Sequence, residues 1–161
     1  MSYKNENMKM IELHENGLDI QFRIRENGVV ELADFSSQEV KKAVMEPKDD
    51  ICYPAVEIHR SGTGSLNMHA YKNNINQSSV DFVYENHELK AQAGGKELEI
   101  VMISPEKLKA VYHMRLFDGV PAVQTWTEII NEGSEDQGLT YVSSFMYQGI
   151  SRGGEKPYYK K

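Results

Sequence analysis

The sequence has one cysteine, one tryptophan and no long apolar run. A disulfide needs two cysteines, so Cys52 alone excludes an intramolecular disulfide and a zinc site built from several cysteines. No stretch approaches the roughly 20 consecutive apolar residues of a membrane-spanning helix. The first residues also lack the apolar core, roughly 7 to 15 residues long, of a secretory signal peptide. The sequence therefore predicts a cytoplasmic protein with no membrane partner.

Positive charge is also scarce. The chain has 18 Lys and Arg against 24 Asp and Glu, a formal net charge of -6. Nucleic acids attract concentrated lysine and arginine, so no nucleic-acid partner is predicted. With 40% hydrophobic and 26% charged residues, the 161-residue chain is typical of one folded globular domain rather than a disordered one.

Strand-like patterns dominate the C-terminal half. Residues 108–147 are rich in Val, Ile, Thr and Tyr, and they are interrupted at Asp118-Gly119 and at Asn131-Glu132-Gly133, where tight reversals can form. They predict three successive strands. In the first strand, alternate residues share one face, which is predicted to be buried, while His113 lies on the other face. The predicted buried face holds Leu108, Ala110, Tyr112, Met114 and Leu116.

The N-terminal half adds predicted hairpins. Asn16-Gly17 and Asn27-Gly28 each separate two strand-like runs, and Asn-Gly in this position is a strong hairpin signal. Residues 59–79 are polar and lack periodicity, so they predict a mostly exposed loop. Short strands with almost no helical segment predict an all-β fold, an antiparallel β-sandwich. The predicted organisation is a disordered tail at 1–7, a β-sandwich domain at 8–150, and a polar tail or truncated continuation at 151–161.

Three groupings of acidic residues are candidates for acid and base catalysis. Hydrolysis of a sugar linkage needs two carboxyl groups roughly 5 to 9.5 Å apart across a pocket, and no spacing in the sequence indicates such a pair. The grouping around Glu132 lies in a predicted turn, where acidic residues are common for solubility, so a structural role is favoured for it. The groupings are Asp49 with Asp50, Glu57 near His59, and Glu132 with Glu135 and Asp136.

The five histidines show no HxH or HExxH spacing, so neither a metal site nor another cofactor is predicted. His59 is a candidate ligand-binding residue at the start of the polar segment, with simple solvation as the competing interpretation. Aromatic rings such as Trp126 and Tyr141 could stack on a sugar face. Trp126 lies in the middle of an apolar strand, however, so a place in the core is favoured for it.

Several stretches, in order, resemble one known family. They are GLDIQFRIRENGVVELADF, CYPAVEIHRSGTG, KELEIVM, VPAVQTWTEIINEG and LTYVSSF. Together they are similar to the N-terminal domain of glycoside hydrolase family 36 α-galactosidases, over about residues 18 to 150. The resemblance implies a two-layered β-supersandwich, galactose mutarotase-like, which precedes a (β/α)₈ barrel. It further implies that the barrel hydrolyses terminal α-galactosides with retention, using an aspartate nucleophile and an aspartate acid/base.

The chain lacks the Lys-Trp-Asp type sequence of the family's nucleophile, so no catalytic residue is transferred to it. The resemblance implies a chain that is inactive alone and that supports the barrel of a parent enzyme, itself a homo-oligomer. The family's domain can lend a loop to a neighbouring active site. MEPKDDI occupies the corresponding place here, although it is shorter, which makes Asp49 and Asp50 candidates for contact with a galactoside.

Two alternatives remain open at this point. The family's domain is longer than this chain, so the chain is either the first part of the supersandwich or a shortened relative. It can also be a free-standing carbohydrate-binding or protein-interaction module. The candidate substrate-binding residues are Asp49, Asp50, His59 and Trp126.

Overall fold

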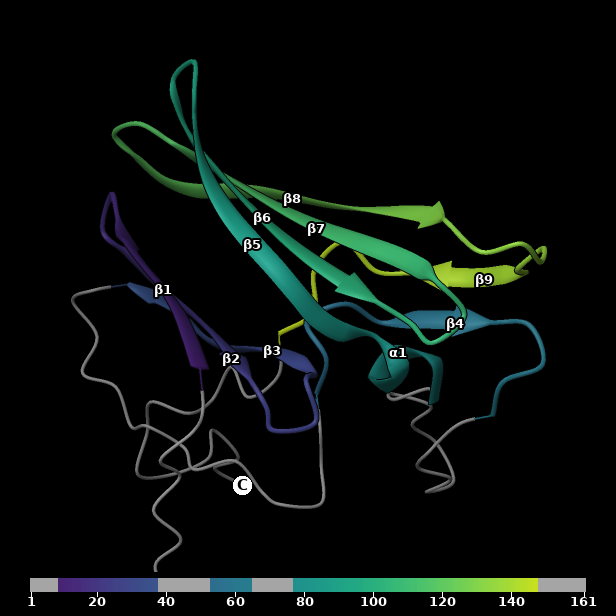
Figure 1. Ribbon diagram of the computed structural model, residues 1–161. Helices are drawn as coiled ribbons and strands as arrows, with labels where there is room; N and C mark the ends of the chain where they lie inside the picture. Colours follow the sequence, from purple (N-terminus) through teal and green to yellow (C-terminus); the bar gives the residue numbers. More distant parts are fainter. Residues whose placement is uncertain (1–8, 38–52, 65–76, 148–161) are drawn as a thin grey trace, which may run out of the picture.

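Antiparallel β-sheet makes up most of the computed structural model, which describes residues 9–37, 53–64 and 77–147 (Figure 1). The predicted all-β, antiparallel sandwich is confirmed. In chain order the elements are β1 (Lys9–Glu15), β2 (Leu18–Ile24), β3 (Val30–Ser37), β4 (Ile58–Arg60), α1 (Gln77–Asp81), β5 (Val83–Gln92), β6 (Gly95–Ile103), β7 (Leu108–Phe117), β8 (Val120–Asn131) and β9 (Leu139–Val142).

The first sheet has the order β1-β2-β3. Glu15 pairs with Leu18, so only Asn16 and Gly17 form the first turn, and both have positive φ, 51° and 83°. A two-residue turn of this kind matches the twist of the strands that it joins, and Asn-Gly is its preferred sequence. Side chains along β2 alternate between buried and half-buried positions. This sheet therefore has one buried face.

The second sheet has the order β5-β6-β7-β8, a meander of strands that follow one another in the chain. On β7 the predicted face is buried, because Leu108, Ala110, Tyr112, Met114 and Leu116 all belong to the hydrophobic core. Residues 77–92 form α1 followed by one long strand, β5, with an irregularity between Tyr84 and Asn86.

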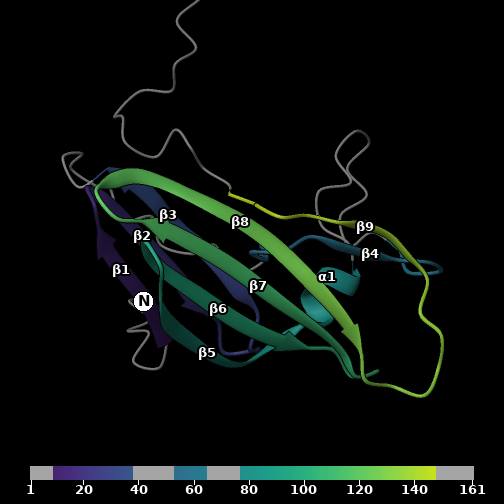
Figure 2. The ribbon, with the colours of Figure 1, turned by 90° about the horizontal axis from the view of Figure 1, so that it is seen from above.

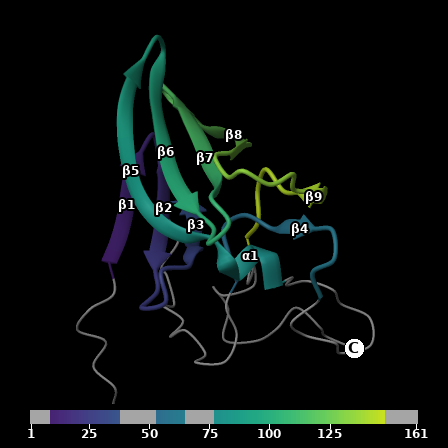
Figure 3. The same cartoon turned by 45° about the vertical axis from the view of Figure 1, so that its right-hand side comes forward.

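The core lies between these two sheets, which face each other in Figure 3. Phe22 from β2 and Tyr112 from β7 are both almost fully buried, and their rings meet edge to face with centroids 5.7 Å apart. Phe35 of β3 contacts the ring of Phe145 at 5.5 Å, near one side of the sandwich. Aromatic pairs therefore join the first sheet both to the second sheet and to the end of the described chain.

The third strand predicted in residues 108–147 forms, but it does not pair with β8. After Asn131 the chain runs past residues 132–138, and β9 pairs antiparallel with β4 in a separate two-stranded sheet, visible from above in Figure 2. The Ser61 amide donates a hydrogen bond of 2.8 Å to the Gly138 carbonyl, which extends this contact beyond β4. The tight reversal predicted at 131–133 was therefore wrong, because the connection between β8 and β9 is longer and runs over residues 132–138.

The polar segment predicted as an exposed loop is structured where it is described. Ser79 Oγ accepts from the Ile58 amide (2.9 Å) and donates to the Ile58 carbonyl (3.0 Å), while Ser78 Oγ accepts from the Arg60 amide (3.2 Å). Both serines are buried, and hydrogen bonds with the backbone of β4 satisfy their hydroxyl groups there. Among the described residues, no helix has the length and apolar character needed to cross a bilayer.

Candidate functional site

Three side chains meet on the β4-β9 pair and form what we call the β4-β9 corner: Glu57, His59 and Tyr141. Tyr141 lies opposite His59 in the strand register, and their rings are 5.1 Å apart at 49°. His59 Nε2 is 2.8 Å from Glu57 Oε1, and Glu57 is buried whereas Tyr141 is 51% exposed. The corner thus presents an open aromatic ring beside an imidazole that is held by a buried carboxylate.

Backbone hydrogen bonds hold Glu57 in place. Its amide donates to Ser143 Oγ (2.8 Å), and its carbonyl accepts from the Ser143 amide (2.9 Å). Thr140 Oγ1 donates to the His59 carbonyl (3.3 Å) on the same strand pair. Because both strands are fixed along their length, the relative positions of the His59 and Tyr141 rings are set by the sheet rather than by loop geometry.

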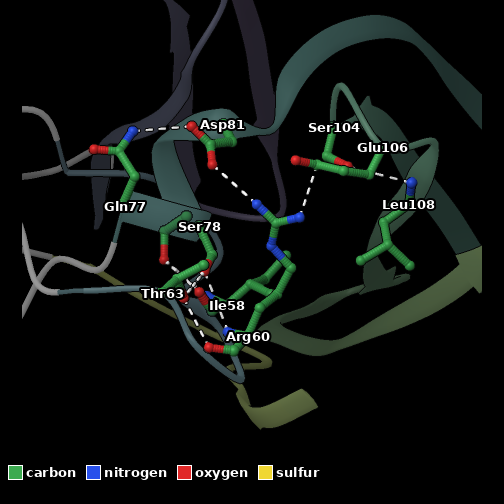
Figure 4. A network of polar contacts seen from close by, with 10 residues as sticks. Ile58, Arg60, Thr63, Gln77, Ser78, Asp81, Ser104, Glu106 and Leu108 are labelled. Carbon is green, nitrogen blue, oxygen red and sulfur yellow. Dashed lines mark hydrogen bonds and ion pairs between the residues drawn. The ribbon is translucent and has the colours of Figure 1, made fainter. Parts of the chain in front are cut away.

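The residue after His59 in β4 is a buried arginine, Arg60, whose polar contacts are shown in Figure 4. Arg60 has a side chain that is only 7% exposed, and it pairs with Asp81 (3.0 Å) and with Glu106 (2.7 Å). Gln77 Nε2 also donates to Asp81 (2.9 Å). Burial tends to raise the pKa of Glu106, but hydrogen bonds from its backbone, from Arg60 and from Ser104 outweigh this effect and lower it. Through its ion pairs with Asp81 and Glu106, Arg60 connects β4 to α1 and to the turn that precedes β7.

The arrangement at the β4-β9 corner suits binding better than bond cleavage. A half-exposed tyrosine offers a flat apolar surface and one polar group, which is how aromatic side chains contact sugar rings. The Glu57 carboxylate already faces His59, and a glycosidase needs a second carboxyl group at a set distance across the scissile bond. The chemistry that these three residues support is stacking together with hydrogen bonding.

Of the residues predicted from the sequence, His59 belongs to this corner. Trp126 lies elsewhere: it pairs with His113 across β7 and β8, and the two rings are stacked at 4.6 Å and 5°. Trp126 is half-buried on the face of the sheet that points away from the core, so the favoured core role was wrong. Asp49 and Asp50 lie outside the described residues.

Among the turn acids, the Glu132 carboxylate accepts from Lys109 Nζ, and the backbone carbonyl of Glu135 accepts from Asn131 Nδ2 (2.9 Å). Sequence reasoning did not single out Arg60, although a pattern could have revealed it. Val56, Ile58 and Arg60 follow one another at a spacing of two, which places the arginine on the buried face of its strand.

A scan against models of protein families finds no match, and a search of curated proteins finds none either. Only the sequence motifs and the geometry of these side chains therefore point to a function. A β-sandwich hosts many unrelated functions, so the fold alone does not select one.

Proposed function

We propose that this chain is a non-catalytic β-sandwich domain of a cytoplasmic, α-galactosidase-like glycoside hydrolase. In this proposal it supports a catalytic barrel that lies outside the chain, and it contributes to assembly of the oligomeric enzyme. One observation carries the proposal. The stretches that resemble the family, taken in order, coincide with strands of a single sandwich.

The correspondence extends along the described chain. GLDIQFRIRENGVVELADF covers the β2-β3 hairpin, and KELEIVM lies within β6. VPAVQTWTEIINEG begins with β8 and ends just after it, and LTYVSSF begins with β9. Stretches that carry a family resemblance are expected to form the shared framework, because strand pairing and core packing constrain their residues most strongly.

The outer strands of the two larger sheets also favour a supporting role. β5 and β8 are the two outer strands of the four-stranded sheet, and β1 and β3 are those of the three-stranded sheet. The edge of a sheet presents backbone groups that can pair with further strands. A sandwich of this form can therefore be continued into the larger, two-layered supersandwich that the resemblance implies.

We expect the isolated chain to show no turnover of an aryl α-galactoside, because the nucleophile and the acid/base are proposed to lie in the barrel. A matched preparation of Glu57→Gln, expressed and purified in the same way, controls for contaminating host enzyme. Turnover by the wild-type chain that is lost in Glu57→Gln would contradict the proposal, since it would place chemistry in this domain. A reading frame that continues into alternating strand and helix patterns would support it.

The β4-β9 corner favours carbohydrate binding as a second candidate function. We expect calorimetric titration with melibiose to show saturable binding, weakened about 2- to 10-fold by Tyr141→Ala, because an aromatic contact contributes about 0.5 to 1.5 kcal/mol. Tyr141→Phe keeps the ring and should retain most of the affinity. Trp126→Ala is the aromatic control, since Trp126 lies in a different sheet from His59.

Equal melibiose affinity in wild type and Tyr141→Ala would exclude the corner as the binding surface. If the titration shows no saturable heat, carbohydrate binding by this chain is excluded, and the proposed supporting role is unaffected. Self-association without sugar binding would instead favour a protein-interaction module.

A further inference from the structure

The outward face of the four-stranded sheet carries a group of polar side chains around His113. Glu99, His113 and Trp126 lie opposite one another on β6, β7 and β8, and Glu97 is two residues from Glu99 on the same strand. Although this face points away from the core, the His113 side chain is only 8% exposed. A buried imidazole on an outer sheet face needs specific partners, because its ring nitrogens are removed from water.

One ring nitrogen faces two carboxylates. His113 Nδ1 lies 2.9 Å from Glu97 Oε1 and 3.9 Å from Glu99 Oε1. One ligand atom from each of the three residues can be chosen so that all of them lie within 4.8 Å of one another. Ligands bound to one ion at about 2.0 to 2.2 Å cannot be much further apart than this. One ligand atom from each of the three side chains is therefore close enough to the others for the three to reach a single ion.

The other ring nitrogen has no hydrogen-bond partner within the described part of the chain. His113 Nε2 is 3.8 Å from Glu128 Oε2, and the Glu128 side chain is 56% exposed, so it is free to move closer. A histidine that binds a metal through one nitrogen usually donates the other N–H to a carboxylate, which fixes the tautomer. Glu128 is positioned for that second contact, and the stacked Trp126 ring holds the imidazole plane.

We propose that Glu97, Glu99 and His113 bind a divalent transition-metal ion of the zinc type. His113 Nδ1 and one oxygen from each glutamate are the ligands, and His113 Nε2–H is directed at Glu128. A mixed set of imidazole and carboxylate ligands suits zinc and its first-row neighbours better than calcium or magnesium, which prefer oxygen alone. Three protein ligands leave one tetrahedral position for water.

Lys90 competes with such an ion. Its ammonium group pairs with Glu99 Oε2 and lies 3.8 Å from Glu88, and its side chain is 37% exposed, so it can swing into solvent. In the absence of an ion, Lys90 supplies the positive charge that Glu99 needs. Metal binding should therefore become tighter when this competing charge is removed, an effect that a purely structural histidine–glutamate pair does not predict.

Trp126 is the only tryptophan, so its fluorescence reports on this site directly. The experiment uses the full chain, stripped with a chelator and titrated with Co²⁺, whose incomplete d shell quenches a nearby indole. We expect saturable quenching with a stoichiometry of one ion, reversed when Zn²⁺ is added in competition. Quenching that does not saturate, or that Zn²⁺ does not reverse, would overturn the proposal.

Variants identify the ligands. Loss of a supporting group already costs roughly 10- to 100-fold in metal affinity, so Glu99→Gln and His113→Gln should weaken Co²⁺ binding by at least about tenfold. Lys90→Met should strengthen it. His14→Gln, which alters an exposed histidine paired with Asp19 on the other sheet, is the control and should leave the affinity unchanged.

Binding that is equally tight in wild type and Glu99→Gln would contradict the assignment. So would Lys90→Met binding no tighter than wild type. If His113→Gln fails to fold by circular dichroism, Glu99→Gln and Lys90→Met still decide the question, because both alter partly exposed side chains.

Discussion

Phe22→Ala is expected to lower the free energy of unfolding by about 3 to 5 kcal/mol, the range for deleting a fully buried phenylalanine ring. Phe22 is 0% exposed, and its ring packs against Tyr112 of the opposite sheet. Truncation removes the ring contact between the layers and leaves a cavity where neither sheet can collapse freely. A domain has a total stability of only about 5 to 15 kcal/mol, so the variant should lose a large part of it.

Urea unfolding followed by tryptophan fluorescence measures this loss. Phe22→Leu keeps most of the volume and should lose less than the alanine variant. Leu139→Ala is the surface control, since Leu139 is 40% exposed, and it should stay within about 0.5 kcal/mol of wild type. A midpoint for Phe22→Ala close to that of Leu139→Ala would show that the two sheets are not packed through this pair.

Arg60→Met is expected to destabilise the protein by about 3 kcal/mol, near the lower end for breaking a buried ion pair. The change leaves Asp81 and Glu106 without their shared cation, although both carboxylates keep partial contact with water. Lys109→Met breaks the more exposed pair with Glu132 and should change stability by only about 0 to 1 kcal/mol. Equal effects of the two substitutions would mean that Arg60 acts only as a surface charge.

The Arg60 effect should also depend on pH in a defined direction. Glu106 has a pKa below its ordinary value of 4.5 in the folded protein. Its contribution to stability is therefore fully present above about pH 4.5 and is lost as the pH falls through the lower folded pKa. The stability difference between wild type and Arg60→Met should shrink in acid, as parallel urea titrations at neutral and acidic pH would measure. A difference that grows in acid would contradict this linkage.

The sequence correctly predicted the features that are determined by residues close together in the chain. The alternation from Leu108 to Leu116 and the turn at Asn16-Gly17 both follow from residue type and spacing, and the structure confirms them. The pairing of β4 with β9 could not be predicted, because β4 has only three residues and its partner is far away in the chain. Ser78 and Ser79 belonged to a segment predicted to be mostly exposed, because polarity does not reveal a buried backbone partner.

The side-chain clusters were predictable to different degrees. Glu57 and His59 are two residues apart, so a strand places them on one face, and the sequence had already grouped them. Trp126 was misplaced because its position in the middle of an apolar strand favoured the core, whereas the strand register assigns it to the outer face. Glu97, Glu99 and His113 come from two strands, so the spacing between histidines could not bring them together.

The pairing of Ile58 with Val142 has a consequence for folding kinetics. The sheets β1-β2-β3 and β5-β6-β7-β8 join strands that follow one another, so their hairpins can form early. β4 pairs with β9, which lies near the other end of the described chain, and closing so large a loop is entropically unfavourable. We therefore expect residues 58–60 and 139–142 to have low φ-values, with docking of this strand pair as a late step after the two sheets have condensed.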